Sequence, residues 1–224
     1  MDWEALALSV RLSLWTTGVL LVVGLPVAYW LVFARWRWKF LVEAVVALPL
    51  VLPPTVLGFY LLLAFSPRGL LGAGYVDLTG RTLAFSFEGL VIASVLYSLP
   101  FAVQPFAAAF ASIDRTFLEA SWSLGASRGA TFVRVILPLA RRGILTGMVL
   151  AFAHTLGEFG VVLMVGGNLP GVTRTVSIAI YDQVQALNYD AALRTSLLLL
   201  AVSFVVLAVT YGLQRRVTAA WPLR

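Results

Sequence analysis

Cysteine is absent from the 224 residues of the chain, and histidine and lysine each occur once. Without cysteine the chain can form neither a disulfide nor a thiolate metal site, and one histidine, His154, cannot build a multi-histidine metal centre within one chain. The lysine, Lys39, follows a tryptophan, so the chain lacks the glycine-rich loop ending in Gly-Lys-Ser/Thr that cradles nucleotide phosphates. We therefore predict no catalytic residue, no metal and no cofactor in this chain.

Charged residues are also scarce, because they make up 12% of the chain while hydrophobic residues make up 61%. Soluble domains contain roughly 25% charged and 45–50% apolar residues. A soluble protein of this length could not bury so much apolar surface, whereas a helix that spans a lipid bilayer needs about 20 apolar residues. The composition predicts an all-α, polytopic membrane protein. The net charge of +6 then reflects membrane topology, and we predict no nucleic-acid partner.

Five apolar stretches are long enough to cross the membrane, and together they predict a single membrane domain over residues 1–224. The predicted spans are residues 12–33, 40–65, 87–110, 143–165 and 191–213. Pro49, Pro53 and Pro54 predict a kink or short break in the second span, since each proline removes a helix donor and clashes with the preceding turn. Such a break is either a packing kink or a place where freed backbone groups face a pathway.

The basic residues are divided unequally between the two sides of a five-span chain. Eleven lie in the 35–39 loop, the 112–142 loop and the tail from residue 215, and five lie on the opposite side. Positive residues concentrate in the cytoplasmic loops of membrane proteins. We therefore predict that the N-terminus lies outside and the C-terminus lies in the cytoplasm.

The polar segment 112–142 predicts a helical hairpin that protrudes from the membrane. Asp114 is suited to cap its first helix, and Gly125 can adopt the left-handed conformation that ends that helix. Ser127 can cap a second short helix, which Pro138 would end. On spacing alone, a surface hairpin that only connects two spans is an equally good interpretation.

His154 and Glu158 form the strongly polar pair of the fourth predicted span, and their i,i+4 spacing places them on one face of a helix. Ionisable residues at membrane depth are functional candidates. Three interpretations are open: a structural contact in which His154 or a neighbouring helix satisfies Glu158, contact with substrate, or a proton relay. Together with Pro53, Pro54 and Thr155, the pair forms the candidate pathway or gate. The other hydroxyls that could line a weak path are Thr55, Ser94 and Ser98.

One segment resembles the EAA loop of ABC-importer permeases, which has the pattern Glu-Ala-Ala, three residues, Gly, nine residues, Ile, one residue, Leu-Pro. The matching positions are Glu119, Ala120, Ser121, Gly125, Leu137 and Pro138. Ser121 replaces the second alanine, and Val135 replaces the isoleucine. The resemblance implies a type I ABC-importer permease fold, and it implies that these residues form a coupling helix that docks on a separate ATPase.

Three further segments, 48–54, 156–160 and 167–175, resemble molybdate-transport permeases. This resemblance implies a transporter permease subunit, not an enzyme, of an ATP-driven molybdate importer in the cell inner membrane. Its implied partners are a second copy in a homodimer, two cytoplasmic ABC ATPase subunits that bind the ATP, and an external, periplasmic substrate-binding protein. The alternatives are a sulfate or tungstate permease and, in a different class, a proton-coupled secondary transporter based on His154 and Glu158.

Overall fold

The computed structural model describes residues 2–219, without the side chains of residues 209, 211 and 213–219. Within this range every regular element is a helix and no strand occurs, so the predicted all-α fold is confirmed. The basic residues expected to mark a cytoplasmic tail fall outside the described residues: the side chains of Arg215 and Arg216 and the whole of Arg224.

The helices cover most of the described chain. In order they are α1 (Trp3–Phe33), α2 (Lys39–Ala47), η1 (Leu48–Leu50), α3 (Pro54–Phe65), α4 (Leu70–Thr79), α5 (Phe87–Ala111), α6 (Arg115–Ser123), α7 (Arg128–Thr131), η2 (Phe132–Ile136), α8 (Leu137–Leu156), α9 (Gly160–Gly166), α10 (Val176–Gln185) and α11 (Tyr189–Ala219). Four stretches of the described chain are long and apolar enough to cross a membrane: Trp3–Phe33, Phe87–Ala111, Arg128–Leu156 and Tyr189–Ala208. The number is five when the bent pair Lys39–Leu50 and Pro54–Phe65 is taken as one span, which agrees with the prediction of about five.

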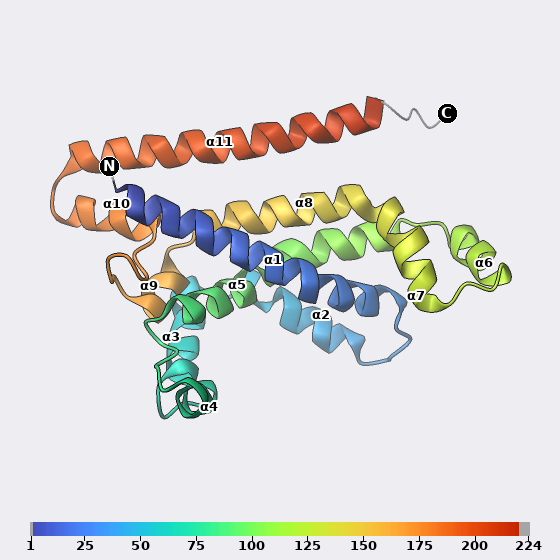
Figure 1. Ribbon diagram of the computed structural model, residues 1–224, viewed down its shortest axis with the longest axis horizontal. Coiled ribbons are helices and arrows are strands. Elements are labelled where there is room, and N and C mark those ends of the chain that lie inside the picture. Colours follow the sequence, from blue (N-terminus) through green and yellow to red (C-terminus); the bar gives the residue numbers. More distant parts are fainter. Residues whose placement is uncertain (1, 220–224) are drawn as a thin grey trace.

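Helices α1, α5 and α8 form the centre of the molecule and lie along its long axis (Figure 1). Glycines let them approach closely: a side chain at Gly24 of α1 would press on Phe106 of α5, and one at Gly147 of α8 would press on Phe106 and the Ala102 carbonyl. In lipid, apolar helices gain little hydrophobic driving force from each other, so close van der Waals packing of this kind holds them together.

The predicted break in the second span is confirmed between η1 and α3. The two halves are bent by 109°, and Figure 1 shows α3 and α4 directed away from the central bundle. Pro54 begins α3, where its missing N–H costs nothing because the first turn of a helix has no intrahelical acceptor for it. After the bend, α3 packs on α9, where Gly58 faces Met164.

Helix α1 begins at Trp3, well before the predicted start of the first span at residue 12. The Asp2 carboxylate accepts a hydrogen bond from the Ala5 N–H at 2.9 Å and caps the helix. The charge of Arg11 inside the helix is accommodated because its guanidinium lies 4.4 Å from the centre of the Phe87 ring. Hydropathy does not register the cap at Asp2 or the contact of Arg11 with Phe87, so the start predicted from hydropathy was too late.

The fourth predicted span, residues 143–165, is divided in the structure. Helix α8 ends at Leu156, and α9 begins at Gly160 after a short non-helical segment. Gly157 and Gly160 flank this break. Glycine weakens a helix because it loses more backbone entropy on folding than other residues do. The segments predicted as connections after the second and fourth spans also contain helices, namely α4 and α10.

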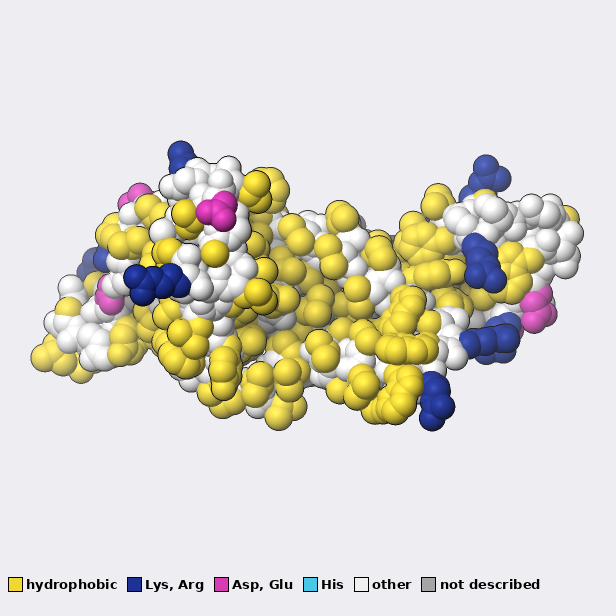
Figure 2. Space-filling model, turned by 90° about the horizontal axis from the view of Figure 1, so that it is seen from below, with side chains coloured by type: hydrophobic (Ala, Val, Ile, Leu, Met, Phe, Trp, Pro, Cys, Tyr) yellow, Lys and Arg dark blue, Asp and Glu magenta, His cyan; other side chains and the backbone are white. Residues whose placement is uncertain are grey.

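Charged side chains gather towards the two ends of the molecule. Figure 2 shows a face with an apolar middle and with Lys, Arg, Asp and Glu side chains near both ends. The 35–39 loop, the hairpin of α6 and α7, and the C-terminal end of α11 all lie at one end (Figure 1). We call this the hairpin end. It contains the segments that the count of basic residues assigned to one side of the membrane.

Candidate functional site

The first helix of the predicted hairpin has the caps that the sequence indicated. The Asp114 carboxylate accepts hydrogen bonds from the backbone N–H of Thr116 (2.9 Å) and from its hydroxyl (2.7 Å). These bonds stabilise the charged form and lower the pKa of Asp114 below its ordinary value. Gly125 follows the end of α6 with φ at +81°, in the left-handed region that favours glycine. Both predictions are confirmed.

The second helix begins as predicted but does not end at Pro138. The Ser127 hydroxyl accepts a hydrogen bond from the Ala130 N–H at 3.2 Å, and the chain then stays helical from Arg128 to Leu156 over 29 residues. Residues 132–136 are wound as a π-helix, and the change from π to α bonding accommodates the donor that Pro138 lacks. The hairpin is therefore continuous with α8, the helix of the fourth predicted span.

The predicted coupling residues occupy two places. Glu119 and Ala120 are exposed on α6, and Ser121 faces the second arm, where its hydroxyl oxygen lies 3.0 Å from that of Thr131. Gly125 forms the turn. Leu137 and Pro138 lie apart from the turn, at the start of α8.

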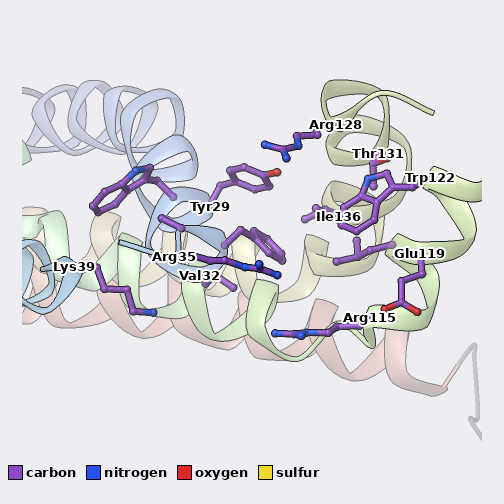
Figure 3. Close-up of a pocket in the computed structure, with 14 residues that line it drawn as sticks. Tyr29, Val32, Arg35, Lys39, Arg115, Glu119, Trp122, Arg128, Thr131 and Ile136 are labelled. Atoms are coloured by element: carbon purple, nitrogen blue, oxygen red, sulfur yellow. The ribbon is translucent and has the colours of Figure 1, made fainter. Parts of the chain in front are cut away.

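A cavity of about 900 Å³ separates the hairpin from the end of α1 (Figure 3). Its wall on the hairpin side comes from α6, α7 and η2, and its opposite wall comes from the last turns of α1, the loop after it and the first residue of α2. The residues that line it are Tyr29, Trp30, Val32, Phe33, Ala34, Arg35, Lys39, Arg115, Leu118, Glu119, Trp122, Arg128, Thr131 and Ile136. Sequence reasoning treated Arg35, Arg115 and Arg128 only as markers of topology and missed that they share one cavity.

A second cavity brings together candidate pathway residues from two predicted spans. Pro54, His154 and Glu158 all line a space of about 470 Å³, together with Thr55 and Tyr97. Two other candidates are placed differently. Thr155 is buried behind this wall, and Pro53 is not among the lining residues.

His154 is held by α5 rather than by Glu158. Its Nδ1 atom lies 2.9 Å from the Ser98 hydroxyl oxygen, which is also 2.9 Å from the Thr155 hydroxyl oxygen. The imidazole stacks on Phe101 with ring centres 3.9 Å apart. The prediction that His154 and Glu158 share one face of a helix is therefore wrong, because α8 ends at Leu156 and its i,i+4 geometry does not extend to residue 158. The alternative in which His154 satisfies Glu158 is not supported either.

Glu158 is 4% exposed, and neither of its carboxylate oxygens has a hydrogen-bond partner among the described residues. The Ser94 hydroxyl oxygen of α5 is likewise buried without a hydrogen-bond partner. The interpretation that a neighbouring helix satisfies Glu158 is not supported within this chain. Tyr97 and Phe101, which flank His154, were missed; their i,i+4 spacing around Ser98 on α5 was the available signal.

The family model described as the inner membrane component of binding-protein-dependent transport systems matches residues 21–219. The chain belongs to this family. It is thus a multi-pass inner-membrane transport component rather than an enzyme, and the predicted resemblance to ABC-importer permeases is confirmed.

Relatives within the family are similar along nearly their whole length. The chain is 50% identical over 214 residues to the molybdenum transport system permease protein ModB of Azotobacter vinelandii, covering 96% of this chain and 95% of the relative. It is 36% identical over 215 residues to ModB of Escherichia coli K12, covering 96% and 94%. Among solved structures, the MetNI methionine ABC transporter in inward-facing conformations matches with a TM-score of 0.71 and 19% identity, covering 97% of this chain and 94% of the other. That likeness shows the shared fold.

Proposed function

We propose that this chain is the permease subunit of an ATP-driven importer for molybdate and forms its path across the membrane. The observation that carries the proposal is the 50% identity with a molybdenum permease over 96% of the chain. Sulfate and tungstate are tetrahedral dianions of the same kind, and they are the competing cargoes.

We propose further that the chain acts as a homodimer with two cytoplasmic ATPase subunits and an external substrate-binding protein. ATP then belongs to the ATPase subunits, and this chain needs no cofactor. The incomplete wall of the 470 Å³ cavity supports a second copy, because His154, Phe159 and Leu163 line that cavity and remain partly exposed. A facing copy would supply the missing wall.

The hairpin is the proposed site of coupling, with Glu119, Ala120, Ser121 and Gly125 at its centre. It protrudes at the hairpin end, and its outer surface carries exposed apolar side chains, with Phe117 at 56% and Leu124 at 89% exposure. Such side chains suit a docking surface on a protein partner. Leu137 and Pro138 act differently in this proposal, because they join the hairpin to α8 and transmit its movement.

The proposed path runs beside the bend at Pro53 and Pro54 and past the residues His154, Thr155 and Glu158. The hydrogen bond between Ser98 and His154 supports a structural role for His154. A carboxylate at Glu158 would repel a dianion, and the described helices place no arginine beside it. Weak binding along the path suits conduction, so selectivity is assigned to the external binding protein.

The test is transport by the complete complex in sealed liposomes, with the binding protein on the outside and ATP within. We expect molybdate uptake that needs ATP and the binding protein and that continues when the proton gradient is dissipated. Competition with tungstate and sulfate then ranks the cargoes. Uptake that collapses with the proton gradient at constant ATP would favour a secondary transporter, and preferential sulfate uptake would replace the proposed cargo.

A further inference from the structure

The cavity between the hairpin and α1 has a strong excess of positive charge. Four cationic side chains line it, namely Arg35, Lys39, Arg115 and Arg128, against the single carboxylate of Glu119. Figure 3 shows the three guanidinium groups directed into the same space from both walls. An anion inside this cavity would meet cations from the segment after α1 and from both arms of the hairpin.

The arginines in this cavity lack an ion-pair partner among the described residues. In the part of the chain that the structure describes, neither Arg35, Arg115 nor Arg128 forms an ion pair. Lys39 is partly engaged, since its Nζ lies 3.9 Å from a Glu43 oxygen and donates to the Leu31 carbonyl at 3.3 Å. Gathering like charges without a counter-ion is unfavourable, so the cluster is suited to an anion from outside the chain.

Apart from Thr131, the rest of the lining is apolar or aromatic. Tyr29, Trp30 and Phe33 come from the last turns of α1, and Trp122 comes from α6. The cavity lies at the hairpin end, where the apolar middle of the molecule meets its charged end. Tryptophan and tyrosine favour this interfacial level of a membrane, and basic pockets there bind lipid head groups.

We propose that this cavity binds the phosphate head group of an anionic phospholipid from the leaflet at the hairpin end. The arginines bind the phosphate oxygens, and the aromatic wall packs against the glycerol and the first part of the acyl chains. Arginine suits this task because its planar fork of donors matches phosphate oxygens. The proposal concerns a partner of the membrane and is independent of the cargo.

The lining of the cavity favours a lipid over a protein partner and over a small free oxyanion. The apolar residues of the hairpin that we assign to docking, Phe117 and Leu124, do not line the cavity, so they stay available to a protein partner while a lipid is bound. Of the proposed coupling residues, Glu119 alone lines it. A small free oxyanion would contact the arginines but would leave the aromatic wall without a partner. The lipid matches both parts of the lining.

A bound head group would also connect the hairpin to α1, because Arg35 lies after α1 while Arg115 and Arg128 begin the two arms of the hairpin. Among the described residues, one direct aromatic contact joins α1 to this region. The ring of Tyr29 packs on the ring of Phe132, and the two ring centres are 5.1 Å apart. The lipid would therefore stabilise the position of the hairpin, and ATP hydrolysis by the complex would depend on anionic lipid.

The test uses the complete permease–ATPase complex in nanodiscs of phosphatidylcholine with increasing phosphatidylglycerol, and native mass spectrometry counts the phosphatidylglycerol retained. The variant combines Arg35→Gln with Arg128→Gln. The matched control combines Arg37→Gln with Arg134→Gln, which removes the same charge at the same end from residues that do not line the cavity. We expect retention to fall about fivefold for each cavity cation removed and to change little in the control.

Other outcomes overturn the proposal. Equal loss in the variant and the control would indicate general attraction to the membrane surface. Loss of inorganic phosphate or molybdate binding with unchanged lipid retention would identify a site for free oxyanions. Loss of the ATPase subunit with unchanged lipid retention would make the cavity part of the protein interface. Arg128→Lys keeps the charge but not the planar fork, so it is expected to retain more lipid than Arg128→Gln and less than the unchanged chain. A thermal midpoint close to that of the unchanged complex shows that each variant folds.

Discussion

The Nδ1 atom of His154 on α8 lies 2.9 Å from the hydroxyl oxygen of Ser98 on α5. This contact joins two helices of the central bundle and continues to the Thr155 hydroxyl. Glu158 is not part of it, and among the described residues the histidine has no hydrogen bond to a carboxylate. A polar link between neighbouring helices is the role that this geometry supports.

His154→Gln is therefore expected to leave uptake dependent on ATP and insensitive to dissipation of the proton gradient. Glutamine can still bond to Ser98, so the free energy of unfolding should fall by about 1 kcal/mol or less. Uptake by the reconstituted complex with and without a protonophore measures the first effect, and thermal unfolding measures the second. Ser98→Ala serves as the comparison, because it removes the contact from the other side.

Gly125→Ala should weaken coupling between the hairpin and ATP hydrolysis. An alanine in the left-handed conformation costs about 1–2 kcal/mol, although a Cβ at this position meets no atom within 4 Å. The effect is thus one of backbone conformation and not of packing. Substrate-stimulated ATP hydrolysis and uptake should both fall while the protein still inserts in the membrane.

The matched control for that prediction is Gly129→Ala in the same hairpin. A Cβ there also meets no atom within 4 Å, and the backbone does not have a positive φ. Normal coupling in the Gly129 variant and reduced coupling in the Gly125 variant is the expected pattern. Full activity of both would remove the role that we propose for the turn.

Acidification should loosen the start of α6. Because hydrogen bonds from Thr116 lower the pKa of Asp114 in the folded state, the cap is fully effective above the ordinary aspartate pKa of about 3.9 and is lost as the pH falls through the lowered folded pKa. Hydrogen-exchange protection of the first turn should decline over that window. Asp114→Asn retains an acceptor but not the titration, so its protection should vary less with pH.

Gly160→Ala should disturb the contact between α9 and α3. A Cβ at this position would lie 2.7 Å from the Cβ atom of Pro54, whose ring cannot turn away. Overpacking of this kind costs about 1–3 kcal/mol. Gly157→Ala is the control, since its Cβ would meet only backbone carbonyls of α8 at 3.9 Å or more. A lower thermal midpoint is expected for the first variant alone, and equal midpoints would contradict the close packing.

The proposed topology can be tested on a background without cysteine. Leu78→Cys and Leu124→Cys lie at opposite ends of the molecule, and both side chains are highly exposed, at 87% and 89%. A maleimide that cannot cross membranes should label residue 78 in intact cells and residue 124 only after the membrane is opened. The reverse pattern would invert the proposed orientation.

The features that sequence predicted well are local. Caps at Asp114 and Ser127, the turn at Gly125 and the break before Pro54 each depend on one residue type and its immediate neighbours, and all are present. The family was predictable for a related reason, because its loop pattern lies in one continuous segment. Local chemistry decides these features before tertiary packing acts.

The features that sequence did not predict depend on contacts between distant segments. Ser98 and His154, which form a hydrogen bond, are 56 residues apart in the sequence. Arg35 and Arg128 line one cavity only because α1 and the hairpin lie next to each other in the fold. The continuation through Pro138 was missed because a proline normally ends a helix, and only the π-wound turn before it removes that conflict.

Helix α8 would act as a lever if the hairpin docks as we propose, because it joins the hairpin to the buried polar site. Its 20 residues extend about 30 Å at 1.5 Å per residue, so a tilt of about 5° at one end would move the other by about 2–3 Å. The π-wound residues 132–136 lie at the bend where α7 and α8 run in different directions (Figure 1). No loop interrupts the helical stretch from Arg128 to Leu156, so a movement of the hairpin would reach the Ser98 contact through helix alone.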